Sequence, residues 1–130
     1  MNYTIQTGPN QEEGIRSTTD WNESFQSDKN YIIIRCREDS NGELLGQIVI
    51  DLQFKCSWLL YLAVKPEKRN QGIETELMSK AERTITSRGY KNILLNAEQE
   101  ALIPYYENLG YSKVKQDEET NEWIMQKIFE

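Results

Sequence analysis

The stretch that begins at Tyr61 constrains the fold most strongly, because it joins a strand pattern to a helix pattern through a short loop. The loop carries a proline, the basic residues Lys65, Lys68 and Arg69, and then Gly72, after which a helical repeat starts. A helix N-terminus offers unpaired amide hydrogens and about half a positive charge, so it suits a pyrophosphate. A glycine here lets the backbone approach a ligand closely. The stretch predicts an anion-binding loop, and the alternative for Gly72 is an ordinary turn residue.

Size and charge limit the class of protein. A chain of 130 residues is long enough for one domain, residues 1–130, with a single core. The 15 basic and 21 acidic side chains give a net charge of -6, which predicts no binding to nucleic acid or to an anionic membrane. The acidity favours a cationic substrate or simply serves solubility. Histidine is absent, which excludes histidine-based triads and histidine-metal sites.

Cys36 and Cys56 lie in apolar, strand-like segments and have no metal-ligand spacing, so we expect buried free thiols in a reducing cytosol and no metal site. The N-terminus has no apolar run of the signal-peptide kind, and nowhere do about 18 apolar residues occur together. These observations predict a soluble, cytoplasmic protein.

The first half of the chain predicts a short helix and three strands. Residues 3–7 suit an edge strand, and Trp21 and Phe25, four apart, suit a helix capped by Thr18 or Asp20. Strand patterns follow at residues 31–36 and 44–54, and the Asn-Gly pair at 41–42 between them predicts a tight turn whose two central residues have positive φ.

The second half predicts a sheet centre flanked by helices. Residues 58–64 are apolar at nearly every position, as expected for a strand covered on both faces. A helix is expected next, with apolar residues at every fourth position and an end at Arg88-Gly89; those apolar residues are Ile73, Leu77, Ala81 and Ile85. A short strand at 93–95 precedes a helix at 101–109, which has Pro104 in its first turn and stops at Gly110. Residues 111–115 and 123–129 form a closing hairpin around the acidic loop 117–119. The order predicts an α+β fold with a mixed, mainly antiparallel sheet.

Three segments together resemble the Gcn5-related N-acetyltransferase (GNAT) family, over about residues 30 to 129. The run Arg69-Asn-Gln-Gly72-Ile-Glu74 matches the family signature Arg/Gln-x-x-Gly-x-Gly/Ala in every fixed position but the last. Val64-Lys65-Pro66 matches the Val-x-Pro step before it, and residues 103–111 are similar to the family segment Phe-Tyr-Glu-x-Leu-Gly-Phe. The resemblance implies the GNAT fold of acyl-CoA N-acyltransferases, with a central sheet flanked by helices.

The resemblance also implies acetyl-coenzyme A as co-substrate and a set of site residues. Tyr106 takes the position of the general acid that protonates the departing thiolate, with packing alone as the alternative, while Tyr105 should face the core. The amide of Gln99 either binds the cofactor or begins the helix. In the family, a bulged strand holds the pantetheine arm and the loop holds the pyrophosphate; by position these roles fall to Leu62, Ala63, Val64, Arg69, Asn70, Gln71, Gly72, Ile73, Glu74 and Thr75.

Glu74 departs from the family pattern, because the family has Gly or Ala where the backbone passes close to the phosphates. The favoured function is transfer of an acetyl group to the primary amine of a small molecule or peptide. The general base is open between Asp51 and Glu98, each of which has a surface charge as its alternative role. The alternative function is a weak or inactive GNAT-like module that binds acyl-CoA or a protein partner, and an oligomer is possible.

Overall fold

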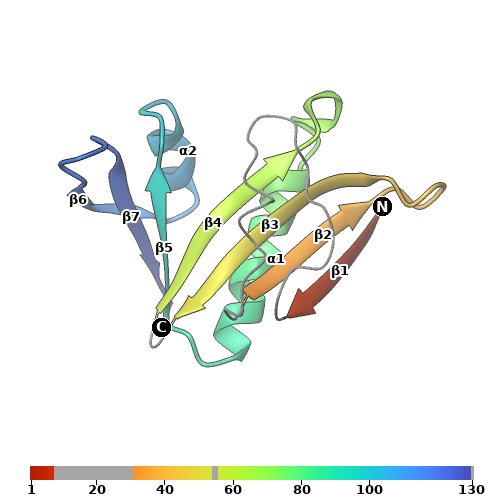
Figure 1. The fold of residues 1–130 in the computed structure, drawn as a ribbon, viewed down its shortest axis with the longest axis horizontal. Coiled ribbons are helices and arrows are strands. Elements are labelled where there is room, and N and C mark those ends of the chain that lie inside the picture. The colour runs from red at the N-terminus through yellow and green to blue at the C-terminus, as the bar shows by residue number, and fades with distance from the viewer. Residues whose placement is uncertain (8–30, 54–55, 130) are drawn as a thin grey trace.

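The structure is a computed structural model that describes residues 1–7, 31–53 and 56–129. Among these residues the chain forms one seven-stranded sheet with the order β1-β2-β3-β4-β5-β7-β6 (Figure 1). The helix expected around Trp21 and Phe25 lies outside the described residues. The strands are β1 (Asn2–Thr7), β2 (Tyr31–Arg37), β3 (Leu44–Gln53), β4 (Cys56–Val64), β5 (Asn92–Ala97), β6 (Ser112–Gln116) and β7 (Trp123–Ile128). The helices are the 3-10 turn η2 (Pro66–Lys68), α1 (Ile73–Ser87) and α2 (Leu102–Asn108).

The sheet is mixed, as the sequence predicted. Among the described strands, β4 and β5 run parallel and the other neighbouring pairs are antiparallel. The expected edge strand β1 does lie at one edge, and the closing hairpin of β6 and β7 lies at the other. The α+β prediction is therefore confirmed.

The connection between β2 and β3 differs from the expected tight turn. A tight turn would need positive φ at both Asn41 and Gly42. Gly42 has a φ of 71°, but the φ of Asn41 is not positive. The amide of Glu38 donates to the carbonyl of Glu43 at 2.9 Å, and the amide of Gly42 donates to the carbonyl of Glu38 at 2.9 Å. The loop thus spans residues 38–43, and the two-residue turn was wrong. Longer hairpin loops also place a left-handed residue just before the second strand, so an Asn-Gly pair suits both.

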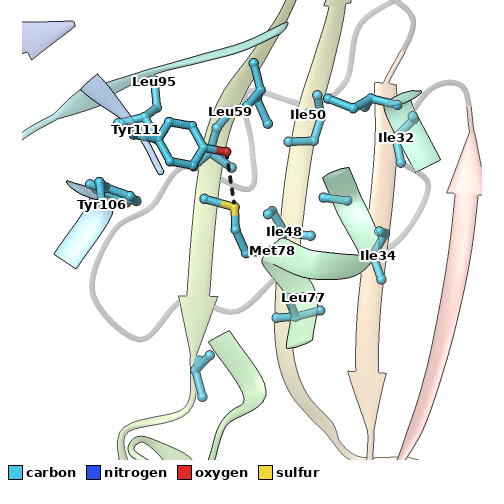
Figure 2. Packing of buried hydrophobic residues seen from close by; sticks show 14 of the residues in the cluster. Ile32, Ile34, Ile48, Ile50, Leu59, Leu77, Met78, Leu95, Tyr106 and Tyr111 are labelled. Carbon is cyan, nitrogen blue, oxygen red and sulfur yellow. Dashed lines mark hydrogen bonds between the residues drawn. The ribbon is translucent and has the colours of Figure 1, made fainter. Parts of the chain in front are cut away.

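Helix α1 covers one face of the sheet and forms the main core with it (Figure 2). The predicted apolar residues Ile73, Leu77, Ala81 and Ile85 are all buried. They belong to one cluster with alternate residues of the facing strands, namely Ile32, Ile34, Ile48 and Ile50. Each large aliphatic side chain buried in this way contributes about 1.5–3 kcal/mol. The burial fixes α1, and with it the helix N-terminus, firmly against the sheet.

A glycine follows each of the helices α1 and α2 at the position where the sequence predicted the helix to end. Gly89 has a φ of 89°, and the amide of Tyr90 donates to the carbonyl of Ile85 at 3.1 Å, which is the bond of a Schellman end. Gly110 has a φ of 99° just after α2, and Pro104 stands in the first turn of that helix. Both predicted helix ends are confirmed.

A glycine on β3 lets the start of α1 approach the end of β4. A Cβ atom on Gly46 would lie 3.1 Å from Cγ2 of Ile73 and 3.2 Å from Cγ2 of Val64. These distances are tighter than ordinary contact, so a side chain here would push the two residues away. Gly46 therefore sets the distance between the strand and the helix that enclose the loop at residues 65–72.

Strand β4 lies at the centre of the sheet, as expected, but the expectation that both faces are covered was wrong. Leu60 is 37% exposed, and Tyr61, Leu62 and Ala63 are partly exposed. An apolar run indicates contact with apolar groups. Leu62 packs against the main core and Tyr61 and Ala63 pack against a second buried cluster, while all four residues also line open hollows.

Candidate active site

The sheet opens between β4 and β5. Among the described residues the two strands pair through Trp58 and Leu94, and beyond this pair they diverge (Figure 1). Parallel strands that separate leave backbone groups along their facing edges without a strand partner. The second half of β4 therefore offers amide hydrogens toward the opening.

Strand β4 carries a bulge at the start of this opening. Tyr61 and Leu59 pair with neighbouring residues of β3, so Leu60 is an extra residue on β4. A bulge bends its strand and strengthens the local twist, which helps β4 turn away from β5. The bulge that the family resemblance implies is thus present, and the predicted pantetheine-binding residues 62–64 follow it directly.

The loop after β4 leaves the N-terminus of α1 open. Asn70 has a φ of 63° and Gly72 a φ of 85°, so two left-handed residues precede the helix. Gly72 is the N-cap, which has no side-chain capping bond, and the amide of Glu76 donates to the carbonyl of Gly72 at 3.0 Å. The amides of residues 73–75 precede this first helical bond and are the donors that an anion would use. Exposed residues Asn70, Gln71, Gly72 and Thr75 surround these amides.

The basic residues of the loop have different roles. Arg69 is exposed, and its Nε donates to the carbonyl of Val64 at 3.3 Å, which holds the side chain beside the end of β4. Lys65 instead forms an ion pair with Glu43 and lies 3.7 Å from Glu67. Lys65 therefore has two acids beside it that balance its charge.

A hollow of about 280 Å³, here called the loop hollow, lies between the end of β4, the start of α1 and α2. It brings together six of the twelve predicted site residues. Its described lining is Leu62, Ala63, Val64, Arg69, Glu74, Leu102, Tyr105 and Tyr106. The fold therefore assembles parts of the chain that are more than forty positions apart in sequence around one space.

A second hollow of about 160 Å³, here called the splay hollow, lies between the diverging strands. It shares Leu62, Ala63, Leu102 and Tyr106 with the loop hollow. Its other described lining residues are Leu59, Leu60, Tyr61, Leu95, Asn96 and Glu98. Because they share these residues, the two hollows adjoin each other, and Tyr106 borders both.

Tyr106 is a buried side chain at the boundary of both hollows. It is 8% exposed, and its ring meets the ring of Tyr105 edge-on at a centroid distance of 5.3 Å. The ring of Tyr111, which lies nearby in Figure 2, is also edge-on to it, at a centroid distance of 6.0 Å. Burial, and then the nearby Tyr105 and Glu98, raise the pKa of Tyr106 to about 12. The phenol therefore keeps its proton at neutral pH and can act as a donor.

Tyr105 faces the core, as expected, and also borders the candidate site. Its ring packs against the main cluster, but the side chain also lines the loop hollow. Its hydroxyl oxygen is buried and has no hydrogen-bond partner among the described residues. Burial, and then the charge of Glu74, raise the pKa of Tyr105. Both tyrosines of the pair therefore border the candidate site.

Gln99 stands apart from both hollows. It is exposed in the turn before α2, where its carbonyl accepts a hydrogen bond from the amide of Leu102 at 3.0 Å. It is absent from the described lining of either hollow. This placement agrees with the alternative that Gln99 begins the helix.

The two candidate bases are placed differently. Glu98 is exposed and lines the splay hollow together with Tyr106. Asp51 is 6% exposed on β3 and is absent from the described lining of both hollows. The structure thus brings Glu98, and not Asp51, to the candidate acid.

Sequence reasoning missed several lining residues. Leu102 borders both hollows, and Leu60 and Asn96 border the splay hollow. The apolar run of β4, which contains Leu60, was the available signal for that residue. Asn96 and Leu102 carry no such signal, since their place depends on how β5 and α2 pack.

Among residues 1–7, 31–53 and 56–129, no three His, Cys, Asp or Glu side chains come together as a metal site. Within the same residues, none of the helices is long and apolar enough to span a membrane. Cys36 is buried as expected, whereas Cys56 is partly exposed, and neither forms a disulfide within the described part of the chain.

Comparison with known proteins agrees with the geometry. The family model of the acetyltransferase (GNAT) family matches residues 3–111. An acetyltransferase of Pectobacterium atrosepticum is 32% identical over 76 residues, which cover 57% of this chain and 54% of that protein. The chain thus spans about half the length of the curated relatives it matches.

Two solved structures show the same fold. The ribosomal-protein-S18-alanine N-acetyltransferase of Escherichia coli is similar with a TM-score of 0.73 and 18% identity, covering 98% of this chain and 94% of that one. The PaiA N-acetyltransferase of Thermoplasma acidophilum, in complex with coenzyme A, has a TM-score of 0.69 and 23% identity, covering 76% of this chain and 61% of that one. With its bulged strand, open helix N-terminus and diverging β4 and β5, this chain has the GNAT fold and belongs to the acetyltransferase (GNAT) family.

Proposed function

We propose that residues 1–130 form one N-acetyltransferase domain, which moves an acetyl group from acetyl-coenzyme A to the primary amine of a small molecule or peptide. One observation carries this proposal: Tyr106 lines the loop hollow and the splay hollow together. A donor in the first hollow and an acceptor in the second would meet beside a protonated phenol.

The loop hollow fits acetyl-coenzyme A as co-substrate. The amides that follow Gly72 and the guanidinium of Arg69 suit the pyrophosphate, and nothing lies within 4 Å of the Cβ position of Gly72. The amides of residues 62–64 suit the pantetheine arm and the thioester carbonyl, because donors fixed before the reaction stabilise a developing oxyanion. The coenzyme A complex of the similarly folded PaiA protein supports this assignment.

The chemistry follows from two side chains. The amine nitrogen forms a bond to the acetyl carbonyl carbon, and the carbon–sulfur bond breaks. Tyr106 donates its proton to the departing sulfur, since a phenol is protonated at neutral pH. Glu98 receives the proton that the amine loses, directly or through water. The products are an acetamide and the free thiol of coenzyme A.

Tyr106→Phe tests the proposal. We expect the turnover number, measured as thiol release from acetyl-coenzyme A, to fall by roughly 10²-fold or more, as for a lost general acid. Coenzyme A affinity in calorimetry should change little. Tyr90→Phe is the matched control, because Tyr90 is a partly buried tyrosine outside the described lining of both hollows. Normal turnover in Tyr106→Phe with a large loss in Tyr105→Phe would move the acid to Tyr105.

A second candidate function is binding of acyl-CoA without turnover. The carboxylate of Glu74 borders the loop hollow where family members have a small residue, and this observation favours weak binding or a sensing role. Binding of coenzyme A with no thiol release for any amine would support this alternative. Absence of coenzyme A binding would contradict both functions.

A further inference from the structure

A partly buried ion pair joins helix α1 to the part of the molecule that carries Tyr106. Lys127 of β7 donates to Oε1 of Glu82 on α1 at 2.9 Å, and the hydroxyl of Tyr111 donates to Oε2 of the same carboxylate at 3.1 Å. The side chains of Glu82 and Lys127 are 16% and 27% exposed, and Tyr111 is 2% exposed. Both oxygens of one carboxylate are therefore bound by groups from outside its own helix.

Lys127 also contacts the end of α2. Its Nζ donates to the carbonyl of Leu109 at 2.8 Å, so the cation lies at the negative end of that helix. A Cβ atom on Gly110 would lie 3.1 Å from Cε of Lys127, and the glycine thus leaves room for the lysine to cross the chain there. One ammonium group therefore links α1, β7 and the end of α2.

The same contacts lead to Tyr106. The amides of Leu109 and Tyr111 each donate to the carbonyl of Tyr106 at 3.0 Å, and the rings of Tyr106 and Tyr111 meet edge-on. Figure 2 shows the hydroxyl of Tyr111 directed toward Met78 of α1, at 3.9 Å from its sulfur. A shift of Lys127 or Tyr111 would therefore move the backbone and the ring of Tyr106.

The proposed reaction needs groups from both sides of this ion pair. Strand β4 and α1 supply the amides assigned to acetyl-coenzyme A, whereas Tyr106 lies on α2, beyond the opening between β4 and β5. Apolar contacts of the main cluster also cross from α1 to α2 and β7, but such contacts have no preferred direction. Charge-assisted hydrogen bonds require particular distances and angles, and a misplacement of about 1 Å can lower a reaction rate by 10²-fold.

From these contacts we infer that Glu82, Lys127 and Tyr111 are positioning residues, which hold the phenol of Tyr106 at a fixed place relative to the acetyl-coenzyme A site on β4 and α1. This inference rests on the proposed acetyltransferase function. The three residues are absent from the described lining of the loop hollow and the splay hollow, so they act through α2 and do not touch the reactants.

A triple variant, Glu82→Leu with Tyr111→Phe and Lys127→Met, separates positioning from stability. Apolar side chains of similar size replace both charges and the hydroxyl together, and such replacements of buried ionic groups are often neutral or stabilising. We expect Tm to stay near that of the wild type, while kcat, measured as thiol release with a panel of primary amines, falls by about tenfold or more. KM for acetyl-coenzyme A should change by less than about threefold, because the assigned amides and Arg69 are untouched.

Glu76→Leu with Lys80→Met is the matched control. Glu76 pairs with Lys80 at 3.5 Å within α1, so this ion pair does not reach α2 or β7, and kcat should stay as in the wild type. Tyr111→Phe alone is a milder variant that removes one hydrogen bond and keeps the ring. It should lower kcat by about threefold or more at unchanged KM, and it decides the question if the triple variant does not fold.

Three outcomes would overturn the inference. Wild-type kcat in the folded triple variant, or in Tyr111→Phe if the triple variant does not fold, would mean that the network does not position Tyr106, while acetyl transfer itself stays in place. An equal fall of kcat in the control would trace the loss to α1 in general. Absence of thiol release from the wild type with every amine would contradict the proposed function, and the inference with it.

Discussion

Glu74 is the residue at which this chain departs most from its family, and its position explains how the acid is accommodated. It lies in the first turn of α1, where a negative charge interacts favourably with the helix dipole. Its side chain is partly exposed and borders the loop hollow, near enough to Tyr105 to raise the pKa of that phenol. The helix thus gains from the same carboxylate that would repel a bound phosphate.

Replacement of Glu74 separates these two effects. Two unit charges about 5 Å apart repel by roughly 1 to 3 kcal/mol, so Glu74→Ala should tighten coenzyme A binding by up to about two decades. Glu74→Gly should tighten it too, but at a cost of roughly 1 kcal/mol in helix stability. Calorimetry at low and high salt measures the affinity, and salt should shrink the gain.

Glu76→Ala is the control for Glu74. Glu76 lies in the same helical turn, ion-pairs with Lys80 at 3.5 Å and is absent from the described lining of the loop hollow. Its loss should leave the affinity nearly unchanged. Weaker binding in both Glu74 variants would mean that the carboxylate makes a useful contact to the ligand.

The residues of the site were predictable where a local motif specified them. Arg69, Gly72 and Tyr106 stand in short runs whose spacing indicates a loop and a helix. The ion pair between Lys65 and Glu43 was not predictable, because it joins residues from different strand connections. The same holds for the approach of Glu98 to Tyr106, which depends on the packing of α2 against β5.

At the scale of elements, the loop between β4 and α1 is the part of the fold that should decide cofactor binding. Gly72 has a φ of 85°, in the left-handed region, with open space around its Cβ position. Gly72→Val should cost about 1–3 kcal/mol of backbone strain and place a branched side chain over the helix amides. We expect a folded protein that gives no heat on titration with coenzyme A.

Gly42→Val is the matched control for this loop. Gly42 has a φ of 71° and also has nothing within 4 Å of its Cβ position, but it lies in the connection between β2 and β3. Thermal unfolding should show a similar loss of stability in both variants, whereas only Gly72→Val should lose binding. If Gly72→Val binds coenzyme A as tightly as the wild type, the assignment of this loop to anion binding is wrong. If Gly42→Val loses as much coenzyme A affinity as Gly72→Val, the loss comes from backbone strain in general and not from this loop.

Elements were predictable wherever periodicity and end signals agreed. The four-residue repeat of α1 and its glycine stop specified both its buried face and its end. The β2–β3 connection was mispredicted because an Asn-Gly pair suits several loop lengths, and the flanking strands decide among them. The coverage of β4 was mispredicted because an apolar run has the same pattern beside a hollow and inside a core.

At the scale of the whole molecule, the sheet consists of two parts that meet at one point. Strands β1 to β4 pair side by side with α1 against them, whereas β5, β7 and β6 form the other part. Trp58 and Leu94 join the parts within the described sheet. The sequence predicted the closing hairpin but not that β7 would lie between β5 and β6, because strand patterns do not specify distant partners.

This arrangement predicts where coenzyme A should restrain the molecule. A ligand in the loop hollow would contact β4 and α1 from one part of the sheet and α2 from the other. In hydrogen exchange, we expect amides 62–64, 73–75 and those of α2 to slow by roughly tenfold or more at saturating coenzyme A. Strand β6 is exposed at every residue, so its amides should exchange by local opening at an unchanged rate. Slowing on the β4 side alone would mean that the ligand does not join the two parts, and equal slowing in β6 would point to general stabilisation without a localised site.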